Sequence, residues 1–156
     1  MGEVYFYHLT ESPLEAILPT LITRARGQGW RIEVRGSDPA RIARLDEFLW
    51  LGSDEGFLPH GLAGGPHDRL QPVILTVAGQ PVQDMACLMA VDGAAIDPAE
   101  AGALQRSLIV FDGNDAAALA RARDQWRSMT GAGIGAKYWA QDDGRWVMKQ
   151  ERAASA

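Results

Sequence analysis

The chain has 156 residues, 47% of them hydrophobic, which suits one domain with a core large enough to need no disulfide or metal. Its formal net charge of −5 is uneven, since residues 1–118 sum to −8 and residues 119–156 to +3. The acidic body disfavours broad binding along duplex DNA, whereas the basic last quarter favours a compact acidic partner, unless the asymmetry is only that of an ordinary solvated surface.

Cysteine usage and hydropathy indicate the cellular compartment in which the protein is expected. The single cysteine, Cys87, lies in an apolar run, so a disulfide framework and a CxxC motif are excluded, and a core position is favoured over a nucleophile. The N-terminus lacks the basic and long apolar regions of a signal peptide, and no apolar stretch approaches about 18 residues. We therefore expect a cytoplasmic protein that does not enter the membrane.

The N-terminal segment predicts a strand followed by a helix. Residues 4–9 are apolar and aromatic, as in a buried strand. Ser12 is expected to cap the following helix, with Pro13 at its first position and Glu15 completing a capping box. Pro19 falls inside the helical pattern and is expected to kink the helix or split off its first turn.

The rest of the chain alternates between strand and helix patterns. Further strands are predicted at 30–34, 73–77, 85–91 and 108–111, with strand-like segments at 137–139 and 145–149. Helices are predicted to begin at Asp38, with Ile42, Leu45, Phe48 and Leu49 facing inward, and to cover about 98–106 and 116–129. This order predicts a single α/β domain over 1–152, a Rossmann-like three-layer fold with a largely parallel central sheet and helices on both faces, and a disordered tail at 153–156.

The sequence has no nucleotide-binding loop, because neither GxxxxGK[ST] nor a GxGxxG that opens a helix is present. Residues 131–137 superficially resemble a phosphate loop. They follow a predicted helix and precede a strand, which is the wrong order for aiming a helix N-terminus at an anion. A helix stop and a turn explain them better, and we expect no cofactor.

Candidate catalytic and metal-binding residues are few. The histidines His8, His60 and His67 form no close ligand array, so we expect no metal. The segment 112–115 is too short for a calcium loop and suits a turn with helix capping. One enzymatic alternative remains: a small nucleotide-binding or hydrolytic Rossmann-like enzyme that uses the C-terminal edge of the sheet, with His60 or Asp112 as its catalytic group.

The predicted helix at 116–129 carries a candidate binding surface. Helical spacing places Leu119 and Trp126 on the core stripe, and Arg123 and Arg127 together on one flank of it. An apolar ledge beside two guanidinium groups suits a peptide that carries a carboxylate next to a hydrophobic side chain. An ordinary amphipathic helix with a solvated basic face would show the same pattern.

A second cluster of large apolar residues, Trp50, Phe57 and Leu58, lies on or beside a segment rich in glycine and proline. Because such a segment runs near the surface, these side chains could form a partner-binding pocket. They could equally form a satellite cluster that holds the loop against the domain.

Several motifs occur in the order and spacing of a known family. They are Phe6-Tyr7-His8-Leu9, Trp30-Arg31-Ile32, Leu45-Asp46-Glu47-Phe48-Leu49-Trp50, the segment FLPHGLAG at 57–64, Phe111-Asp112-Gly113 and Ala122-Arg123-Asp124-Gln125-Trp126-Arg127. Together they resemble the chi subunit of bacterial DNA polymerase III over essentially the whole chain. The LDExLW and FLPHGLAG segments are the specific ones.

The resemblance implies a non-catalytic replication subunit that links the clamp-loader assembly to single-stranded DNA-binding protein. In this family chi binds the acidic, phenylalanine-ended C-terminal tail of that protein, so DNA would be reached only indirectly. Carried over, the tail-binding residues are Arg123, Trp126 and Arg127, with Leu119 and Ile134 lining the pocket. An interface for the psi subunit or another clamp-loader component is implied at Trp50, Phe57, Leu58, Pro59 and His60.

Overall fold

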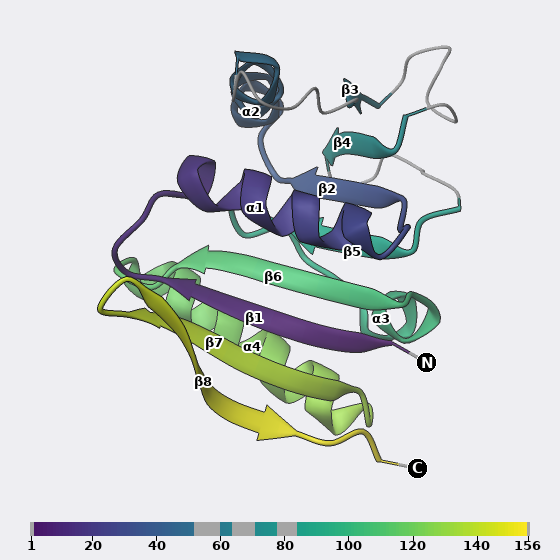
Figure 1. Cartoon of the computed structure of the whole chain (residues 1–156). Helices are drawn as coiled ribbons and strands as arrows, with labels where there is room; N and C mark the ends of the chain where they lie inside the picture. Colours follow the sequence, from purple (N-terminus) through teal and green to yellow (C-terminus); the bar gives the residue numbers. More distant parts are fainter. Residues whose placement is uncertain (1, 52–59, 64–70, 78–83, 156) are drawn as a thin grey trace.

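A computed structural model describes residues 2–51, 60–63, 71–77 and 84–155, with the backbone alone for residues 50 and 51. The elements in chain order are β1 (Glu3–Leu9), α1 (Leu14–Gly27), β2 (Ile32–Gly36), α2 (Pro39–Leu51), β3 (Gly61–Leu62), β4 (Val73–Val77), β5 (Cys87–Ala90), α3 (Pro98–Ala103), β6 (Arg106–Asp112), α4 (Ala116–Gly131), β7 (Gly135–Asp142) and β8 (Arg145–Arg152) (Figure 1). Among these residues no helix is long and apolar enough to cross a membrane.

The described strands form one eight-stranded sheet in the order β3-β4-β2-β5-β6-β1-β7-β8. All neighbouring strands pair in parallel except β7 and β8, which form an antiparallel hairpin at one edge. Parallel neighbours need crossover connections, and α1, α2, α3 and α4 lie between consecutive strands of the chain. The predicted α/β class with a largely parallel sheet is therefore confirmed.

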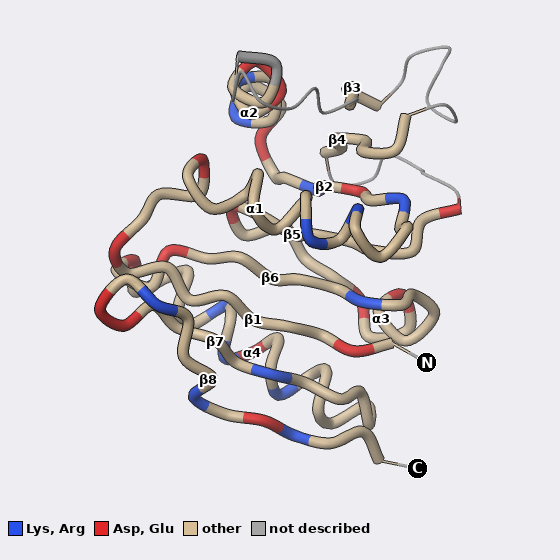
Figure 2. Tube along the Cα trace, in the orientation of Figure 1, with Lys and Arg blue, Asp and Glu red and all other residues tan. Residues whose placement is uncertain are grey.

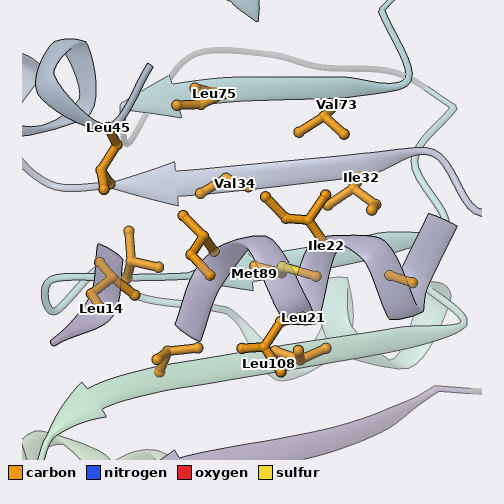
Figure 3. Close-up of a cluster of buried hydrophobic side chains, with 14 of the residues drawn as sticks. Leu14, Leu21, Ile22, Ile32, Val34, Leu45, Val73, Leu75, Met89 and Leu108 are labelled. Carbon is orange, nitrogen blue, oxygen red and sulfur yellow. The ribbon is translucent and has the colours of Figure 1, made fainter. Parts of the chain in front are cut away.

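Two hydrophobic clusters flank this sheet. The alternation of β1 divides its side chains between them, with Val4 and Phe6 in one cluster and Tyr7 and Leu9 in the other. Helices α1 and α2 contribute to the cluster that holds Tyr7, and Figure 3 shows Leu14, Leu21 and Ile22 of α1 beside residues of β2, β5 and β6. Helices α3 and α4 contribute to the cluster that holds Phe6.

The start of α1 differs from the sequence prediction. Pro13, not Ser12, occupies the N-cap position, and no side chain caps the helix there. The Ser12 hydroxyl instead accepts a hydrogen bond from Gln141 Nε2 at 3.0 Å, a contact from the far end of the chain. Helix α1 also runs unbroken through Pro19, because the burial of Leu18 before the proline and of Leu21 and Ile22 after it holds the helix against the sheet.

The inward face of α2 is narrower than predicted. Ile42, Leu45 and Leu49 are buried, at spacings of three and four residues. Phe48 is 41% exposed, so the expectation that it faces inward was wrong. Its position lies about 100° from that of Leu49 around the helix, at the border of the stripe.

The C-terminal quarter consists of α4 and the β7–β8 hairpin. Helix α4 ends at Gly131, and Gly133 follows with a φ of +82°, which confirms the helix stop predicted for this glycine-rich segment. Figure 1 shows α4 behind β7, and Figure 2 shows basic positions along both α4 and the hairpin. After β8 the backbone is irregular, and the Ser155 N–H donates to the Gly133 carbonyl at 3.1 Å.

Candidate functional site

Helix α4, which carries the predicted arginines, is capped at its N-terminus and packed against the sheet. The Asp115 side chain caps its N-terminus by accepting a hydrogen bond from the Ala117 N–H at 3.0 Å. Ala118, Ala122 and Met129 are buried against the sheet. Leu119 and Trp126 are half-buried beside them. The side chains on the neighbouring flank of the helix are therefore fixed in direction by the packing of this stripe.

A cavity of about 510 Å³ lies between α4 and the strands β1, β7 and β8. Its lining residues are His8, Leu119, Arg123, Trp126, Arg127, Tyr138, Ala140, Lys149 and Gln150. Four of them, Leu119, Arg123, Trp126 and Arg127, are among the residues predicted from sequence for the tail site. The structure thus brings both arginines and the indole to one hollow.

The aromatic part of the cavity is continuous with the core. The ring of Trp126 meets that of Phe6 edge-on, with centroids 5.4 Å apart, and lies 6.1 Å from the ring of Tyr138. Phe6 and Tyr138 stack at 6.2 Å with nearly parallel planes. Because Phe6 is fully buried, it anchors both rings that reach the cavity.

The two arginines are available to a ligand. Arg127 Nη1 lies 3.2 Å from Asp124 Oδ1, and about three quarters of each side chain is exposed. An exposed pair of this kind contributes at most about 1 kcal/mol, so a ligand carboxylate can compete for the guanidinium. Arg123 lies close enough to Tyr138 to oppose the rise in the pKa of its hydroxyl that burial causes.

His8 and Tyr138 form the polar contact of the cavity. His8 Nδ1 and the Tyr138 hydroxyl are 2.7 Å apart, which joins β1 to β7. Burial lowers the pKa of His8, and the nearby carboxylate of Asp112 works in the opposite direction. The neutral imidazole is therefore favoured, and the pair orients the phenol ring that borders Trp126.

Not every predicted tail-site residue reaches the cavity. Ile134 is 8% exposed and belongs to the cluster under α4, together with Met129 and Ala136. It does not line the cavity. Its position just before β7 makes it part of the support of the site.

Prediction from one helix missed His8, Tyr138, Ala140, Lys149 and Gln150, which come from three strands. Strand alternation carries a signal for three of them: His8 lies on the same face of β1 as Phe6, and Tyr138 and Ala140 lie on one face of β7. No comparable signal exists for Lys149 and Gln150, because their placement depends on the pairing of β8.

The second predicted surface lies largely outside the described residues. This applies to Phe57, Leu58 and Pro59, and to the side chain of Trp50. His60 is 1% exposed, and its Nε2 lies 3.1 Å from the Asp46 carbonyl oxygen and 3.3 Å from Asp46 Oδ1. His60 therefore links the start of β3 to α2.

A larger cavity, of about 600 Å³, lies at the carboxyl ends of β1, β5 and β6, where the enzymatic alternative would place its substrate. Its charged lining residues are Glu11, Glu15, Arg41, Asp92, Asp112, Asp115 and Arg121. Arg41 is bonded to both Glu15 and Asp92, and the N-terminus of α4 is occupied by the carboxylate of Asp115. An edge with five carboxylates and an occupied helix terminus does not suit a phosphate.

Other reactive groups within the described segments give no second candidate, and His67 lies outside these segments. Among the residues that the structure describes, no three His, Cys, Asp or Glu side chains are grouped so that they could hold a metal ion. Cys87 is fully buried, and burial raises the pKa of its thiol to about 12, with Arg106 opposing the rise. A thiol in that state is a core group, not a nucleophile.

The fold and the cavity together describe an α/β protein with a site suited to an anionic, partly apolar ligand. Residues 1–137 match the profile of the family described as DNA polymerase III chi subunit, HolC. The chain therefore belongs to the chi subunit family, whose members are accessory subunits of the replicative polymerase. A comparison with curated proteins gave no match.

Proposed function

We propose that this chain binds the acidic, phenylalanine-ended C-terminal tail of single-stranded DNA-binding protein and links it to the clamp-loader assembly, without catalysis of its own. The observation that supports this most directly is that one cavity contains Arg123, Arg127 and the Trp126 indole. Membership of the chi family supports a role in replication.

The cavity has the chemistry that such a tail requires. Leu119, Trp126 and Ala140 offer apolar surface to a terminal phenyl ring, while the guanidiniums offer charge-assisted hydrogen bonds to the terminal carboxylate. Its volume of about 510 Å³ falls in the usual range for small-ligand sites. A short chain end therefore fits, whereas a folded partner would need a wider contact.

Calorimetry with a synthetic tail peptide tests the proposal. We expect Arg123→Ala or Arg127→Ala to weaken binding severalfold to about a hundredfold, because each removes a charge-assisted bond. Arg121→Ala is the matched control, since Arg121 lies on the same helix but lines the other cavity. Unchanged affinity in both cavity variants, or equal loss in the control, would contradict the proposal.

A second interface, for the psi subunit or another clamp-loader component, is proposed at Trp50, Phe57, Leu58, Pro59 and His60. Exposed apolar side chains at the adjoining elements support it: Phe48 of α2 is 41% exposed and Leu62 of β3 is 44% exposed. Helix α2 and β3 contact each other, so the two elements that carry these side chains are neighbours. Loss of co-purification of a clamp-loader component on Phe48→Glu would support this interface.

We also propose that the α/β fold is a Rossmann-like three-layer fold and that the protein acts in the cytoplasm. The two separate clusters, one shared by α1 and α2 and the other by α3 and α4, support the layers. The enzymatic alternative predicts nucleotide binding at the C-terminal edge of the sheet. A thermal-shift response to ATP or NAD would favour that alternative.

A further inference from the structure

The β7–β8 hairpin supplies one side of the cavity. Tyr138 and Ala140 come from β7, and Lys149 and Gln150 come from β8, opposite the α4 residues. The family match ends at residue 137, so all four of these residues lie beyond the matched segment. Their contribution to ligand binding therefore depends on the geometry of the hairpin.

The pairing of β7 with β8 shifts register in the part of the hairpin that lines the cavity. Trp139 pairs with Met148, but Tyr138 pairs with Gln150, which leaves Lys149 as the extra residue of a β-bulge. An extra residue breaks the alternation of faces along a strand. As a result Lys149 and Gln150, although consecutive, both line the cavity.

The same shift decides where the carboxylate of Glu151 lies. With the bulge, Glu151 pairs with Lys137, and their charged atoms are 3.8 Å apart. Without it, continuing the Trp139–Met148 register would place Glu151 opposite Ala136, whose side chain belongs to the cluster under α4. The bulge thus keeps a negative charge off the face that carries the cavity, and puts the neutral amide of Gln150 there.

Lys149 is a third cation in the cavity, across from the arginines of α4. Its amine lies 3.6 Å from Asp142 Oδ2, and the two side chains are 48% and 60% exposed. Such a pair is weak and leaves the amine able to turn to another carboxylate. Lysine acts as a mobile point charge, which suits an acidic residue whose position varies.

We propose that the β7–β8 hairpin is the second half of the peptide site, in which Lys149 pairs with an acidic side chain that precedes the terminal carboxylate. This inference rests on the proposed function. It specifies the ligand as a chain end that carries carboxylates in addition to its terminal one. The arginines of α4 hold the chain end, and the hairpin selects for the acidic residues before it.

Two synthetic peptides separate these roles: four aspartates followed by phenylalanine with a free carboxylate, and the same peptide with four asparagines. We expect Lys149→Ala to weaken binding of the aspartate peptide about two- to fivefold, as for an exposed ion pair, and to leave the asparagine peptide unchanged. Lys149→Glu should weaken binding of the aspartate peptide further, because it replaces the cation with a negative charge. Arg145→Ala is the matched control, because Arg145 lies on the same strand and does not line the cavity.

Deletion of Lys149 removes the extra residue of the bulge and keeps both registers, so Gln150 stays opposite Tyr138 and Glu151 stays opposite Lys137. The amine is lost while the amide of Gln150 remains on the cavity face, so binding of the aspartate peptide should fall about as much as in Lys149→Ala. Circular dichroism verifies that the deletion variant is folded. Wild-type affinity in Lys149→Ala, alongside loss in Arg127→Ala, would overturn the role of the hairpin and leave the proposed function standing. Absence of binding by the wild-type protein would overturn the proposed function.

Discussion

His8 Nδ1 and the Tyr138 hydroxyl, 130 residues apart in sequence, are 2.7 Å apart at the cavity. The parallel pairing of β1 with β7 places them together, with Phe6 opposite Tyr138 and His8 opposite Ala140. The His8 ring also contacts Phe111 on β6, with centroids 5.1 Å apart. The imidazole of β1 thus contacts side chains of both neighbouring strands, Phe111 of β6 and Tyr138 of β7.

His8 makes the stability of the protein depend on pH. Burial lowers its pKa in the folded state below the ordinary value of 6.5, so the unfolded chain binds the proton more tightly. The stability from the neutral ring is therefore complete above about pH 6.5 and is lost as pH falls through the folded-state pKa. Urea denaturation at pH 7.5 and 5.5 should show a smaller pH-dependent loss for His8→Gln than for wild type. Identical pH dependence in the two proteins would exclude His8 as the source.

Gly113 provides the space that the His8 ring occupies. A Cβ atom at residue 113 would lie 1.7 Å from His8 Nε2, so Gly113→Ala must displace the imidazole. We expect a loss of about 1–3 kcal/mol in the free energy of unfolding, as for overpacking elsewhere, and weaker binding of the tail peptide.

Gly102→Ala is the control for that substitution. Gly102 lies in α3 with no atom within 4 Å of the added carbon, so alanine should be neutral or stabilise by up to about 1 kcal/mol. Chemical denaturation measures both variants. Equal stability of Gly113→Ala and wild type would show that the ring can move at no cost.

The helical half of the site could be predicted from sequence, and the strand half could not. Arg123, Trp126 and Arg127 lie on one helix, where the 3.6-residue period fixes which side chains are neighbours. Lys149 and Gln150 depend on a bulge, and a shift of one residue in pairing changes the face of every later side chain. No feature of residues 145–152 indicates where the extra residue falls.

The fold shows the same division between local and long-range determinants. The strand at Val73–Val77 has the bounds predicted from sequence, since a short, continuous apolar run is typical of a buried parallel strand. Ser12 carried a strong local capping signal, yet its hydroxyl is engaged by Gln141, from a strand that the local pattern could not place beside it. A tertiary contact here overrides a local preference.

Gln141 organises the connection between β1 and α1 that the capping motif was expected to organise. Its Oε1 accepts hydrogen bonds from the N–H groups of Thr10, Glu11 and Ser12 at 3.0, 3.0 and 3.2 Å, and its Nε2 donates to Ser12 Oγ. Three backbone donors thus converge on one amide oxygen.

Separate substitutions of Gln141 and Ser12 show which of the two residues organises the start of α1. Gln141→Ala removes all four bonds and should lower the free energy of unfolding by about 1–3 kcal/mol, because three N–H groups, of which that of Ser12 is partly buried, lose their shared acceptor. Ser12→Ala removes one bond and should cost about 0.5–1.5 kcal/mol at most. Urea denaturation of both variants measures which substitution lowers the free energy of unfolding more. A larger loss for Ser12→Ala would mean that the hydroxyl, acting locally, governs the start of α1 after all.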